Sequence, residues 1–485
     1  MKNYDLIIIG AGAGGTTSAI EAASFGLKVA LIEKDERVGG AFVLTGTIPS
    51  KTLRETALFI KEYKNRNPYG IKLTLKENLT LKKIKKREVD VVESKVKNLL
   101  ENIYSSNIDL YYGFGSILNE NSVKIIKKDG KEEILKGKVI LISTGSIPFR
   151  NPKIPFDDKL ICDSDSILKL DEMPENIGII GAGVIGLEYA SIFSLFGIDV
   201  FVIDERTSIL KFIDTEIVER LKKSLEENNV KFLLGKKLKE VEVKGKKKVI
   251  CKFSNGKEIK FSNLLVCTGR IGNSINLGLE KLGIEVNERG LIKVNERFQT
   301  KVPNIYAIGD VIGQPALAST AMEQGRLVVD YAFQKKYEKT LPSIIPMGIY
   351  TVPEISTVGL TEDNLKKCGI EYEVGRANYL QIARGTIIGD STGLIKIIAS
   401  KKDQKIQGDL KVPEYLKLKG EFKKDQLLGA HIIGENASEL IHIALSCLYY
   451  HGTVDYFIQS VFNFPTLSDG FKIAAMDYFS KNYSL

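Results

Sequence analysis

Two glycine-rich stretches in this sequence have the residue types and the spacing of a phosphate-binding turn. In the first, IIIGAGAGG, Gly10, Gly12 and Gly15 follow a short apolar strand and precede a helical stretch. The first glycine permits a tight turn, the second lets a pyrophosphate approach the backbone, and the third lets the helix pack on the strand. The next strand, KVALIE, ends at Glu33, which is placed to accept a hydrogen bond from a ribose hydroxyl. Strand, turn, helix, strand and acid in this order predict a dinucleotide site.

The same arrangement occurs a second time, in IGIIGAGVIG. Here Gly181, Gly183 and Gly186 are followed by the strand DVFVID, which ends at Asp204. In both units the acid lies 23 residues after the first glycine. Equal spacing in two separate units favours two real sites, so we expect the chain to hold two dinucleotides.

Each unit also contains an apolar strand that ends in Thr-Gly. These pairs are Thr144-Gly145 in KVILISTGS and Thr268-Gly269 in NLLVCTGR. Either pair alone could be a plain turn at the end of a strand. Their matching order behind the two glycine stretches favours a role in the two binding units.

A further acid is expected at the edge of the sheet where doubly wound folds bind ligands. In NIYAIGDVIG a strand stops at Gly309 and leaves Asp310 at its carboxyl end, within reach of the polar middle of the first dinucleotide. Two dinucleotides make chemical sense if one is a resident flavin, which stores a hydride, and the other a visiting nicotinamide.

The stretch GGAFVLTGTIPSK, residues 39–51, looks like the floor of an active site without a reactive group. Nothing between Gly40 and Ile48 holds an electron, donates a proton readily or binds a metal. Lys51 lies in the first turn of the predicted helix, where its charge has the wrong sign for the helix dipole, so a specific partner is expected. A solvated lysine is the alternative.

Composition limits the remaining classes of protein. A chain of 485 residues predicts about three domains, and the net charge of +9 comes from scattered lysines, which does not favour nucleic-acid binding. The densest basic run, residues 82–87, is interpreted as a solvated helix face. The five cysteines and three histidines show no zinc spacing, and no apolar run is long enough to span a membrane, so we expect a cytoplasmic protein without a metal.

Together these landmarks resemble the pyridine nucleotide-disulfide oxidoreductases, an FAD family. The resemblance runs from IIIGAGAGG through TGSIP, GAGVIGLEYA and NIYAIGDVIG to YTVPEISTVGLTE and FNFPTLSDG. It implies an α/β protein with two Rossmann-like domains and an α+β dimerisation domain. The implied domains are an FAD-binding domain at 1–150 and 273–345, an NAD(P)-binding domain at 151–272, and an interface domain at 346–485, which makes a homodimer or a higher homo-oligomer.

The resemblance also implies which residues contact the nucleotides. FAD is expected to be bound tightly and without a covalent bond, and NAD(H) and NADP(H) are the expected substrates. The implied cofactor-binding residues are Gly10, Gly12, Gly15, Glu33, Lys51, Thr144, Gly145, Gly309, Asp310, Ala318, Gly181, Gly183, Gly186, Asp204, Arg206 and Gly269.

The chain departs from the family at its disulfide chemistry. Most members carry two redox cysteines in the opening stretch, and this sequence has Phe42 and Thr47 at those positions. Near the C-terminus, Phe464 stands where the family has a histidine before Pro-Thr, and Asp469 stands where it has a glutamate. Without thiols and without their base, the route from flavin to a disulfide substrate is absent.

The nucleotide half of the chemistry is retained. In the family, the lysine that Lys51 matches lies beside the flavin and pairs with a glutamate that Glu188 matches, so these two are the expected catalytic residues. The stretches GTIPSK, CDSDSIL and GVIGLEYASIF are most similar to the soluble, FAD-containing NAD(P) transhydrogenases, of the Si-specific type. In such enzymes a hydride passes between NADPH and NAD through flavin N5. The alternatives are an NADH-dependent flavin oxidase or diaphorase, and a nucleotide-binding redox sensor.

Three features of the sequence allow more than one interpretation. Asp204 favours the free 2'-hydroxyl of NAD, whereas Arg206 is either a surface arginine or a compensating charge for the 2'-phosphate of NADP. The lysine-rich stretch 401–425 is a solvated insertion or a docking arm for an acidic partner. The three histidines at 431, 442 and 451 are interpreted as packing or interface residues.

Overall fold

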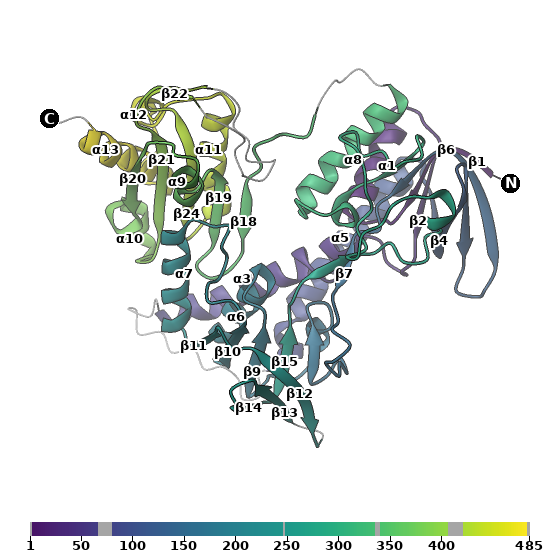
Figure 1. Ribbon diagram of the computed structural model, residues 1–485, viewed down its shortest axis with the longest axis horizontal. Coiled ribbons are helices and arrows are strands. Elements are labelled where there is room, and N and C mark those ends of the chain that lie inside the picture. Colours follow the sequence, from purple (N-terminus) through teal and green to yellow (C-terminus); the bar gives the residue numbers. More distant parts are fainter. Residues whose placement is uncertain (1, 66–79, 246–247, 335–339, 406–420, 483–485) are drawn as a thin grey trace. The chain divides into compact units, whose positions relative to one another are not determined.

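The computed structural model describes residues 2–65, 80–245, 248–334, 340–405 and 421–482 (Figure 1). The chain folds into two compact units. The first contains Met1–Leu53, Lys72–Met173 and Leu265–Leu341, and the second contains Arg54–Ile71, Pro174–Leu264 and Pro342–Leu485. Among the described residues, no helix combines the length and the apolar composition that crossing a membrane requires.

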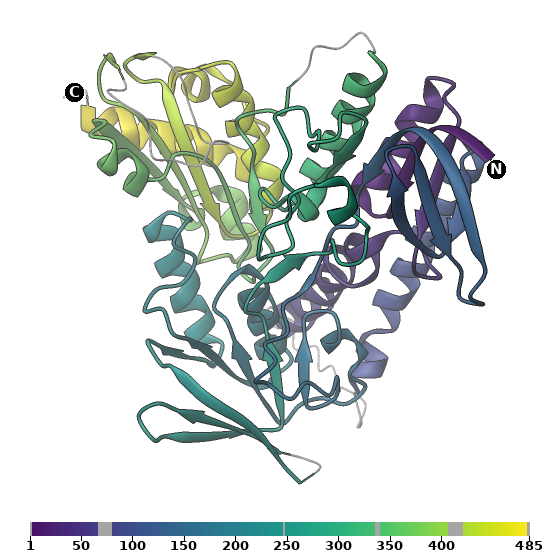
Figure 2. The ribbon, with the colours of Figure 1, turned by 45° about the vertical axis from the view of Figure 1, so that its right-hand side comes forward.

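The first unit is built on a seven-stranded sheet in the order β3-β2-β1-β6-β5-β4, with β17 also paired to β6. Its parallel strands are β1 (Lys2–Ile9), β2 (Val29–Glu33), β3 (Asp109–Tyr112), β6 (Glu132–Ile142) and β17 (Ile305–Ala307). Two antiparallel strands, β4 (Phe114–Asn119) and β5 (Ser122–Ile126), extend it from the first half of β6 (Figure 2). The ends of β1 and β2 are runs of buried aliphatic residues, as expected for parallel strands that are covered on both faces.

Helices α1 (Ala13–Ser24), α2 (Gly40–Leu44), α5 (Lys86–Ser105) and α8 (Ala318–Phe333) share a hydrophobic core with this sheet, and the short helix α4 (Leu81–Ile84) contacts α5. α1 and α8 pack closely because Gly325 has no side chain, and a Cβ there would lie 2.5 Å from Ser18 Oγ. Two short strands, β7 (Ser146–Pro148) and β16 (Arg270–Gly272), form a separate antiparallel pair, and β8 spans Ile161–Asp163. α3 (Thr47–Asn65) begins in the first unit and continues into the second.

The basic run at residues 82–87 is not the single solvated helix face that its composition suggested. The helix is interrupted at Lys85, which is the C-cap of α4 and the N-cap of α5. The Lys85 side chain is buried, donates a hydrogen bond to Leu168 O at 2.8 Å and lies 3.7 Å from Asp171. The other four basic residues of the run are exposed. A sequence pattern could not show this because the partner of Lys85 lies more than 80 residues away.

The second unit contains the other parallel sheet. Its strands β9 (Asn176–Ile180), β10 (Asp199–Asp204) and β11 (Val230–Leu234) lie in the order β11-β10-β9, and β15 (Asn263–Val266) follows β9. The helices are α6 (Val184–Leu195) and α7 (Thr215–Glu227). An antiparallel sheet of β12 (Leu238–Lys244), β13 (Lys248–Phe253) and β14 (Glu258–Phe261) is inserted between β11 and β15.

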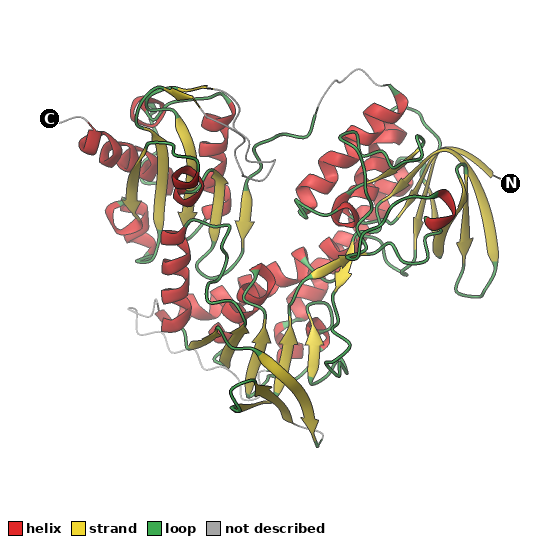
Figure 3. Cartoon of the chain, in the orientation of Figure 1, coloured by secondary structure: helices red, strands yellow, loops and turns green. Residues whose placement is uncertain are grey.

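The C-terminal part of the second unit is an antiparallel sheet with helices (Figure 3). Its strand order is β18-β19-β24-β21-β20, with bounds β18 (Met347–Ile349), β19 (Ile355–Gly359), β20 (Tyr372–Asn378), β21 (Leu394–Ser400) and β24 (Leu427–Ile433). The helices are α9 (Glu362–Lys367), α10 (Ala383–Ile388), α11 (Ala437–Tyr449), α12 (Asp455–Gln459) and α13 (Gly470–Asn482). Of the lysine-rich stretch 401–425, a short pair of β22 (Gln404–Lys405) and β23 (Glu421–Phe422) is described, and residues 406–420 lie outside the described residues.

Candidate functional site

The register of the first sheet brings the predicted residues of the first dinucleotide site to one edge. Ile9, the last residue of β1, pairs with Ile32 of β2 and with Ile142 of β6, and Ile142 also pairs with Ala307 of β17. The residues that follow these strand ends are Gly10, Glu33, Thr144 and Asp310. The carboxyl ends of parallel strands are where doubly wound sheets bind ligands. The sequence therefore predicted that these residues lie at one edge of the sheet, and their contact with a ligand stays a prediction.

The turn between β1 and α1 has the shape of a phosphate cradle. Gly10 has a φ of +105°, and a Cβ there would lie 2.4 Å from Ser143 O. A Cβ on Gly15 would lie 1.9 Å from Gly10 O, so helix and turn are in direct contact. Gly12, the N-cap of α1, differs because a Cβ there would meet nothing within 4 Å. The backbone amides at the start of α1 are thus accessible to an anion.

Glu33 is buried beside this turn. Its Oε2 accepts a hydrogen bond from the Ala11 amide at 2.9 Å, and its Oε1 accepts one from the Asp35 amide at 3.0 Å. Burial raises the pKa of Glu33 above its usual value, although these amides act in the opposite direction. A carboxylate has about four lone-pair sites, so capacity remains for a ribose hydroxyl.

Two further groups at this edge fit a polar ligand. Thr144 Oγ1 is buried and has no hydrogen-bond partner among the described residues. Asp310 follows Gly309 in a 3-10 turn and accepts a hydrogen bond from Ser146 Oγ at 2.6 Å. Ser146 was not singled out from the sequence, although it directly follows Thr144-Gly145. An open glycine, a buried hydroxyl without a partner among the described residues and an acid suit the pyrophosphate and ribose of a dinucleotide.

The bare segment at residues 39–51 lies against the same turn. The Gly39 amide donates a hydrogen bond to Ala11 O at 2.9 Å, and a Cβ on Gly40 would lie 3.0 Å from Gly12 Cα. Phe42, in α2, packs on the hydrophobic core of the first unit, and Thr47, the first residue of α3, is exposed. Lys51 is half-buried, with its Nζ 3.4 Å from Ser50 Oγ.

The cysteines of the chain lie outside the segment 39–51 and are buried or partly buried. All five are free, and burial raises the pKa of every one of them above its usual value. Thiolate, the nucleophilic form, is therefore disfavoured at each position at neutral pH.

The second unit repeats the cradle in detail. Gly181 has a φ of +108°, Gly183 is the N-cap of α6, and a Cβ on Gly186 would lie 2.0 Å from Gly181 O. A Cβ on Gly183 would again meet nothing within 4 Å. Asp204 Oδ2 accepts a hydrogen bond from the Ala182 amide at 2.8 Å, as Glu33 does from Ala11.

Arg206 makes the second site electrostatically different from the first. Its Nε and Nη2 donate to the two oxygens of Asp204 at 2.9 and 2.7 Å, and its amide donates to Oδ1 at 2.9 Å. Burial would raise the pKa of Asp204, but the hydrogen bonds from Arg206 and from the amides lower it below its usual value. Sequence reasoning treated Arg206 as a surface residue or a phosphate contact and did not foresee this clamp on the neighbouring acid.

Other predicted residues of the site are distributed between the two units. Gly269 belongs to the first unit, has a φ of +130° and accepts a hydrogen bond from the Phe149 amide, and Ala318 is the first residue of α8. Glu188 is buried in α6 of the second unit, and its Oε1 accepts a hydrogen bond from the Tyr350 amide at 2.9 Å. The pairing of Lys51 with Glu188 stays a prediction.

The comparisons with known proteins agree with this arrangement. Residues 4–325 match the family model "Pyridine nucleotide-disulphide oxidoreductase", and residues 345–414 and 410–475 match its dimerisation domain. The chain belongs to this family. It is therefore a flavoprotein oxidoreductase with an FAD/NAD-binding part and a C-terminal dimerisation domain, as the sequence motifs predicted.

Curated relatives match along the whole chain. Proteins named soluble pyridine nucleotide transhydrogenase are 39% identical over 486 residues in Mycobacterium tuberculosis, covering 100% of this chain and 99% of that protein. The corresponding protein of Colwellia psychrerythraea is 38% identical over 479 residues, with 98% of each chain covered. The one from Pseudomonas putida is 36% identical over 478 residues, again with 98% of each chain covered.

Solved structures share the fold. The HOCl-induced flavoprotein disulfide reductase RclA from Escherichia coli, as its Cu(II) complex, has a TM-score of 0.86 at 25% identity, covering 98% of this chain and 99% of that one. LpdA from Mycobacterium tuberculosis has a TM-score of 0.86 at 23% identity, with the same coverage. The family likeness therefore includes disulfide reductases, while this chain has Phe42 and Thr47 at the expected cysteine positions.

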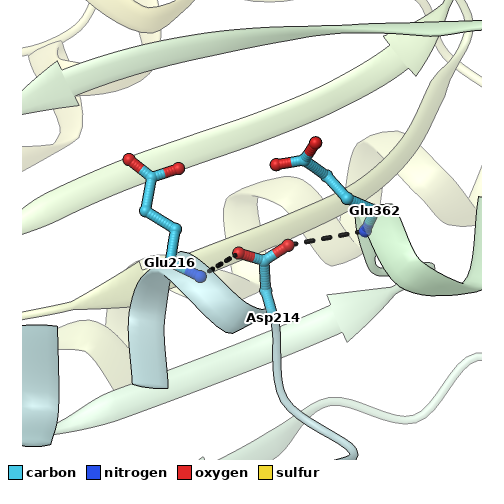
Figure 4. Close-up of side chains that lie close together, drawn as sticks. All are labelled: Asp214, Glu216 and Glu362. Atoms are coloured by element: carbon cyan, nitrogen blue, oxygen red, sulfur yellow. Dashed lines mark hydrogen bonds between the residues drawn. The ribbon is translucent and has the colours of Figure 1, made fainter. Parts of the chain in front are cut away.

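Three carboxylates in the second unit could suggest a metal site, but a lysine lies between them. Asp214, Glu216 and Glu362 bring oxygens within 4.8 Å of one another (Figure 4). The fully buried Lys396 ammonium lies 2.7 Å from Asp214 and 3.0 Å from Glu216, and it also donates to Glu362. The positive charge between these carboxylates is therefore supplied by Lys396, not by a metal ion. The cluster is an ionic network that links α7 to β21 of the C-terminal sheet.

The remaining residues predicted from the sequence near the C-terminus differ in their exposure to solvent. Phe464 is 73% exposed, and Asp469 ends a short 3-10 turn. His431 is fully buried, and its ring contacts Thr357 and lies 3.0 Å from Leu360 O, as expected for a packing residue. His442 and His451 are exposed in the single chain. For these two histidines the prediction of packing in the core is therefore wrong, and an interface role stays a prediction.

Proposed function

We propose that this protein is a soluble FAD-dependent pyridine nucleotide transhydrogenase of the Si-specific type, which passes a hydride between NADPH/NADP and NAD/NADH through flavin N5 without a redox disulfide. The observation that carries the proposal is the combination of two intact dinucleotide cradles with Phe42 and Thr47 at the disulfide positions. Relatives that match the whole chain at 36% to 39% identity carry the name of this activity.

Residues of the first unit would hold FAD tightly and without a covalent bond. The amides at the start of α1, beside Gly12, would bind the pyrophosphate, and Glu33 would accept the ribose hydroxyl. Thr144 Oγ1, which has no partner among the residues that the structure describes, would gain one, and Asp310 would face the polar middle of the cofactor. When bound, the flavin supplies the chemistry, because it accepts a hydride from one nicotinamide and returns it to another.

The protein groups nearest this chemistry would act by position and charge. We propose Lys51 and Glu188 as the catalytic pair, with the ammonium favouring negative charge on the cofactor ring and the carboxylate orienting the ammonium. No acid, base or thiol of the protein is required for hydride transfer, which depends on stacking the two rings in order. The two nucleotides would use one face in turn, which predicts ping-pong kinetics.

The nucleotide preference is the finer question at the second site. The ion pair of Asp204 with Arg206 presents a carboxylate near the ribose and neutralises the arginine that a 2'-phosphate would need. This pair supports a second candidate function, an NADH-dependent flavin oxidase or diaphorase, since that activity needs only NADH. NADPH would bind well only if its phosphate drew Arg206 away from Asp204.

The dimerisation domain supports a homodimer. In the single chain, apolar and aromatic side chains are exposed on its C-terminal helices and on the loop after α12, including Tyr450 at 80%, Val461 at 94% and Phe464 at 73%. Exposed apolar groups of this kind are expected where a second copy covers them. We also propose a cytoplasmic location, since five free cysteines suit a reducing compartment.

One anaerobic assay separates the two functions. The purified flavoprotein is mixed with NADPH and an NAD analogue whose reduced form absorbs at a longer wavelength than NADPH. Reduction of the analogue is expected for the transhydrogenase. Bleaching of the flavin by NADH with no reduction of the analogue would instead support the oxidase or diaphorase.

A disulfide substrate provides the control for the missing thiols. Lipoamide and glutathione disulfide are supplied with NADH under the same conditions, and no turnover above the rate without protein is expected. Rapid reduction of either disulfide would contradict the proposed route, as would a purified protein that contains no flavin.

A further inference from the structure

A buried arginine lies on α3 one turn after Lys51. Arg54 donates from Nε to Thr351 O at 3.1 Å, and its Nη2 lies 3.0 Å from Glu354 Oε2. The side chains of Arg54 and Glu354 are only 8% and 7% exposed. A third contact, from Nη1 to the exposed Glu55, is 2.8 Å long. The guanidinium of Arg54 therefore binds two groups of the segment Tyr350–Glu354, a backbone carbonyl and a carboxylate.

The segment Tyr350–Glu354 is itself firmly held. Glu354 Oε1 accepts a hydrogen bond from the Ser438 amide at 2.6 Å, and Glu354 O accepts one from the Gly434 amide at 2.8 Å. Thr351 Oγ1 donates to Pro353 O at 2.6 Å. Arg54 is thus bound to a part of the C-terminal domain that has its own hydrogen-bond network.

The same segment also holds the glutamate of the proposed catalytic pair. The Tyr350 amide donates to Glu188 Oε1 at 2.9 Å, and the neighbouring residue, Thr351, accepts from Arg54. Lys51 precedes Arg54 by three residues in one continuous helix, which corresponds to about 4.5 Å along the axis on nearly the same face. One short segment of the second unit therefore binds both Glu188 and Arg54, and Arg54 lies in the same helix as Lys51.

Stability alone does not explain this arrangement well. A buried ion pair loses the hydration of both charges, and apolar side chains of similar volume often stabilise a fold as well or better. The pair does, however, specify a geometry, because a planar guanidinium with two acceptors leaves little rotational freedom.

We propose that Arg54 is a positioning residue for the hydride-transfer site. Its contacts with Thr351 O and Glu354 set the turn of α3 that carries Lys51, while the adjacent Tyr350 amide sets Glu188. This inference rests on the proposed function, in which the Lys51 ammonium stabilises negative charge on the cofactor ring.

The test uses the FAD-loaded protein and measures the two-electron midpoint potential of the flavin against a reference dye. The test variant, Arg54→Met with Glu354→Met, removes both charges together, so that no unpaired charge stays buried. We expect its midpoint potential to fall, together with a roughly tenfold to hundredfold slower reduction of the flavin by NADH. A tenfold loss of preference for the reduced ring equals about 30 mV for a two-electron couple.

A double-variant cycle identifies the route of the effect. Lys51→Met alone is expected to lower the potential, and adding the Arg54 and Glu354 changes to it should then lower the potential no further. Arg376→Met is a control for the loss of an arginine ion pair, since Arg376 makes a partly buried pair with Glu216 in the second unit, and Glu216 keeps Lys396 as a partner. It should lower the melting temperature without changing the potential. Arg54→Lys keeps the positive charge but not the planar guanidinium. Its midpoint potential should lie between that of the parent and that of the variant with Arg54→Met and Glu354→Met.

Three results would overturn the inference. The first is an unchanged potential in the double-methionine variant, whatever its melting temperature, because the pair would then be purely structural. The second is an equal drop in potential with and without Lys51, since Arg54 would then not act through that lysine. The third is an equal drop in the Arg376→Met control. None of these readings requires an NAD analogue to be reduced, so failure of transhydrogenation is detected separately.

Discussion

The two dinucleotide units of this chain share one backbone geometry and differ in the charge that surrounds their acids. Gly10 and Gly181 have φ angles of +105° and +108°, and both units leave the second glycine open. Glu33 is a buried carboxylate that accepts hydrogen bonds from backbone amides, and its pKa is raised. Asp204 is clamped by Arg206, and its pKa is lowered.

We propose that this difference suits a resident ligand in the first unit and a visiting ligand in the second. A buried acid with spare acceptor capacity gains most from a ligand that stays and supplies a donor permanently. Asp204 is already paired with Arg206, whose side chain is 56% exposed. This acid therefore keeps its hydrogen bonds while a ligand is absent. We therefore propose that one local motif serves both kinds of binding because the groups around its acid differ.

The largest expected effect comes from filling the two open glycines. Gly12→Val should fold, because Gly12 has a φ of −78° and its Cβ would meet no atom within 4 Å, but the new side chain would occupy the path of the pyrophosphate. We expect FAD affinity to fall at least about 100-fold, or about 2.7 kcal/mol, and the protein to purify without colour. Absorbance at the flavin band, normalised to protein concentration, measures this.

Gly183→Val is the matched change in the second unit, with a φ of −87° and an equally open Cβ position. This variant should keep its flavin and lose reduction of the flavin by NADH. Loss of FAD from both variants, or from neither, would contradict the separation into a resident and a visiting site.

A smaller effect is expected from separating the two partners of the clamp. Arg206→Ala removes the only group of the pair that could contact a 2'-phosphate, so the KM for NADPH should rise about tenfold while that for NADH stays within about twofold. Asp204→Ala should act in the opposite sense and raise the KM for NADH. Steady-state kinetics with each nucleotide measure both constants. Unchanged use of NADPH in the Arg206 variant would remove this residue from the specificity of the site.

The smallest expected effect is a pH dependence of stability with opposite signs in the two units. The folded-state pKa of Asp204 lies below the usual 3.8, so its stabilisation is present above that value and is lost as the pH falls through the folded pKa. Asp204→Asn should therefore lower the free energy of unfolding by about 1 kcal/mol at pH 7, and by less in acid.

Glu33 should behave in the opposite way. Its folded-state pKa lies above the usual 4.5, so its contribution is most favourable below that value and is lost as the pH rises through the folded pKa. As the pH rises, Glu33→Gln should therefore become more stable relative to the parent protein. Thermal unfolding of FAD-free protein at several pH values measures both variants, and slopes of the same sign would contradict the comparison.

Local sequence was sufficient for the cradles because their requirements are local. A positive φ at the first glycine, contact between the third glycine and the turn, and an acid at the end of the next strand all arise within about two dozen residues. The missing redox pair was equally visible, since residue types at positions 42 and 47 are a fact of the sequence. The family model and the full-length relatives confirmed the fold that these patterns predicted.

Contacts between distant segments were not predictable in the same way. Lys85 belongs to a run that looked fully solvated, but it is buried against a carbonyl of residue 168. The sequence of α3 gives no sign that Arg54 is buried. The carbonyl of Thr351 that accepts its hydrogen bond lies 297 residues further along the chain. The side chain of Arg206 could have turned to solvent or to a ligand, and a choice among rotamers is not encoded by spacing alone.

The sequence by itself determined the fold family and the two glycine turns that we propose as dinucleotide sites, because glycine conformation, strand order and residue chemistry are properties of short segments. Only the tertiary structure decided which partner each charged group takes. Those partners come from segments far apart in the chain, and the energy of a charge depends on its burial and on the groups that fold around it.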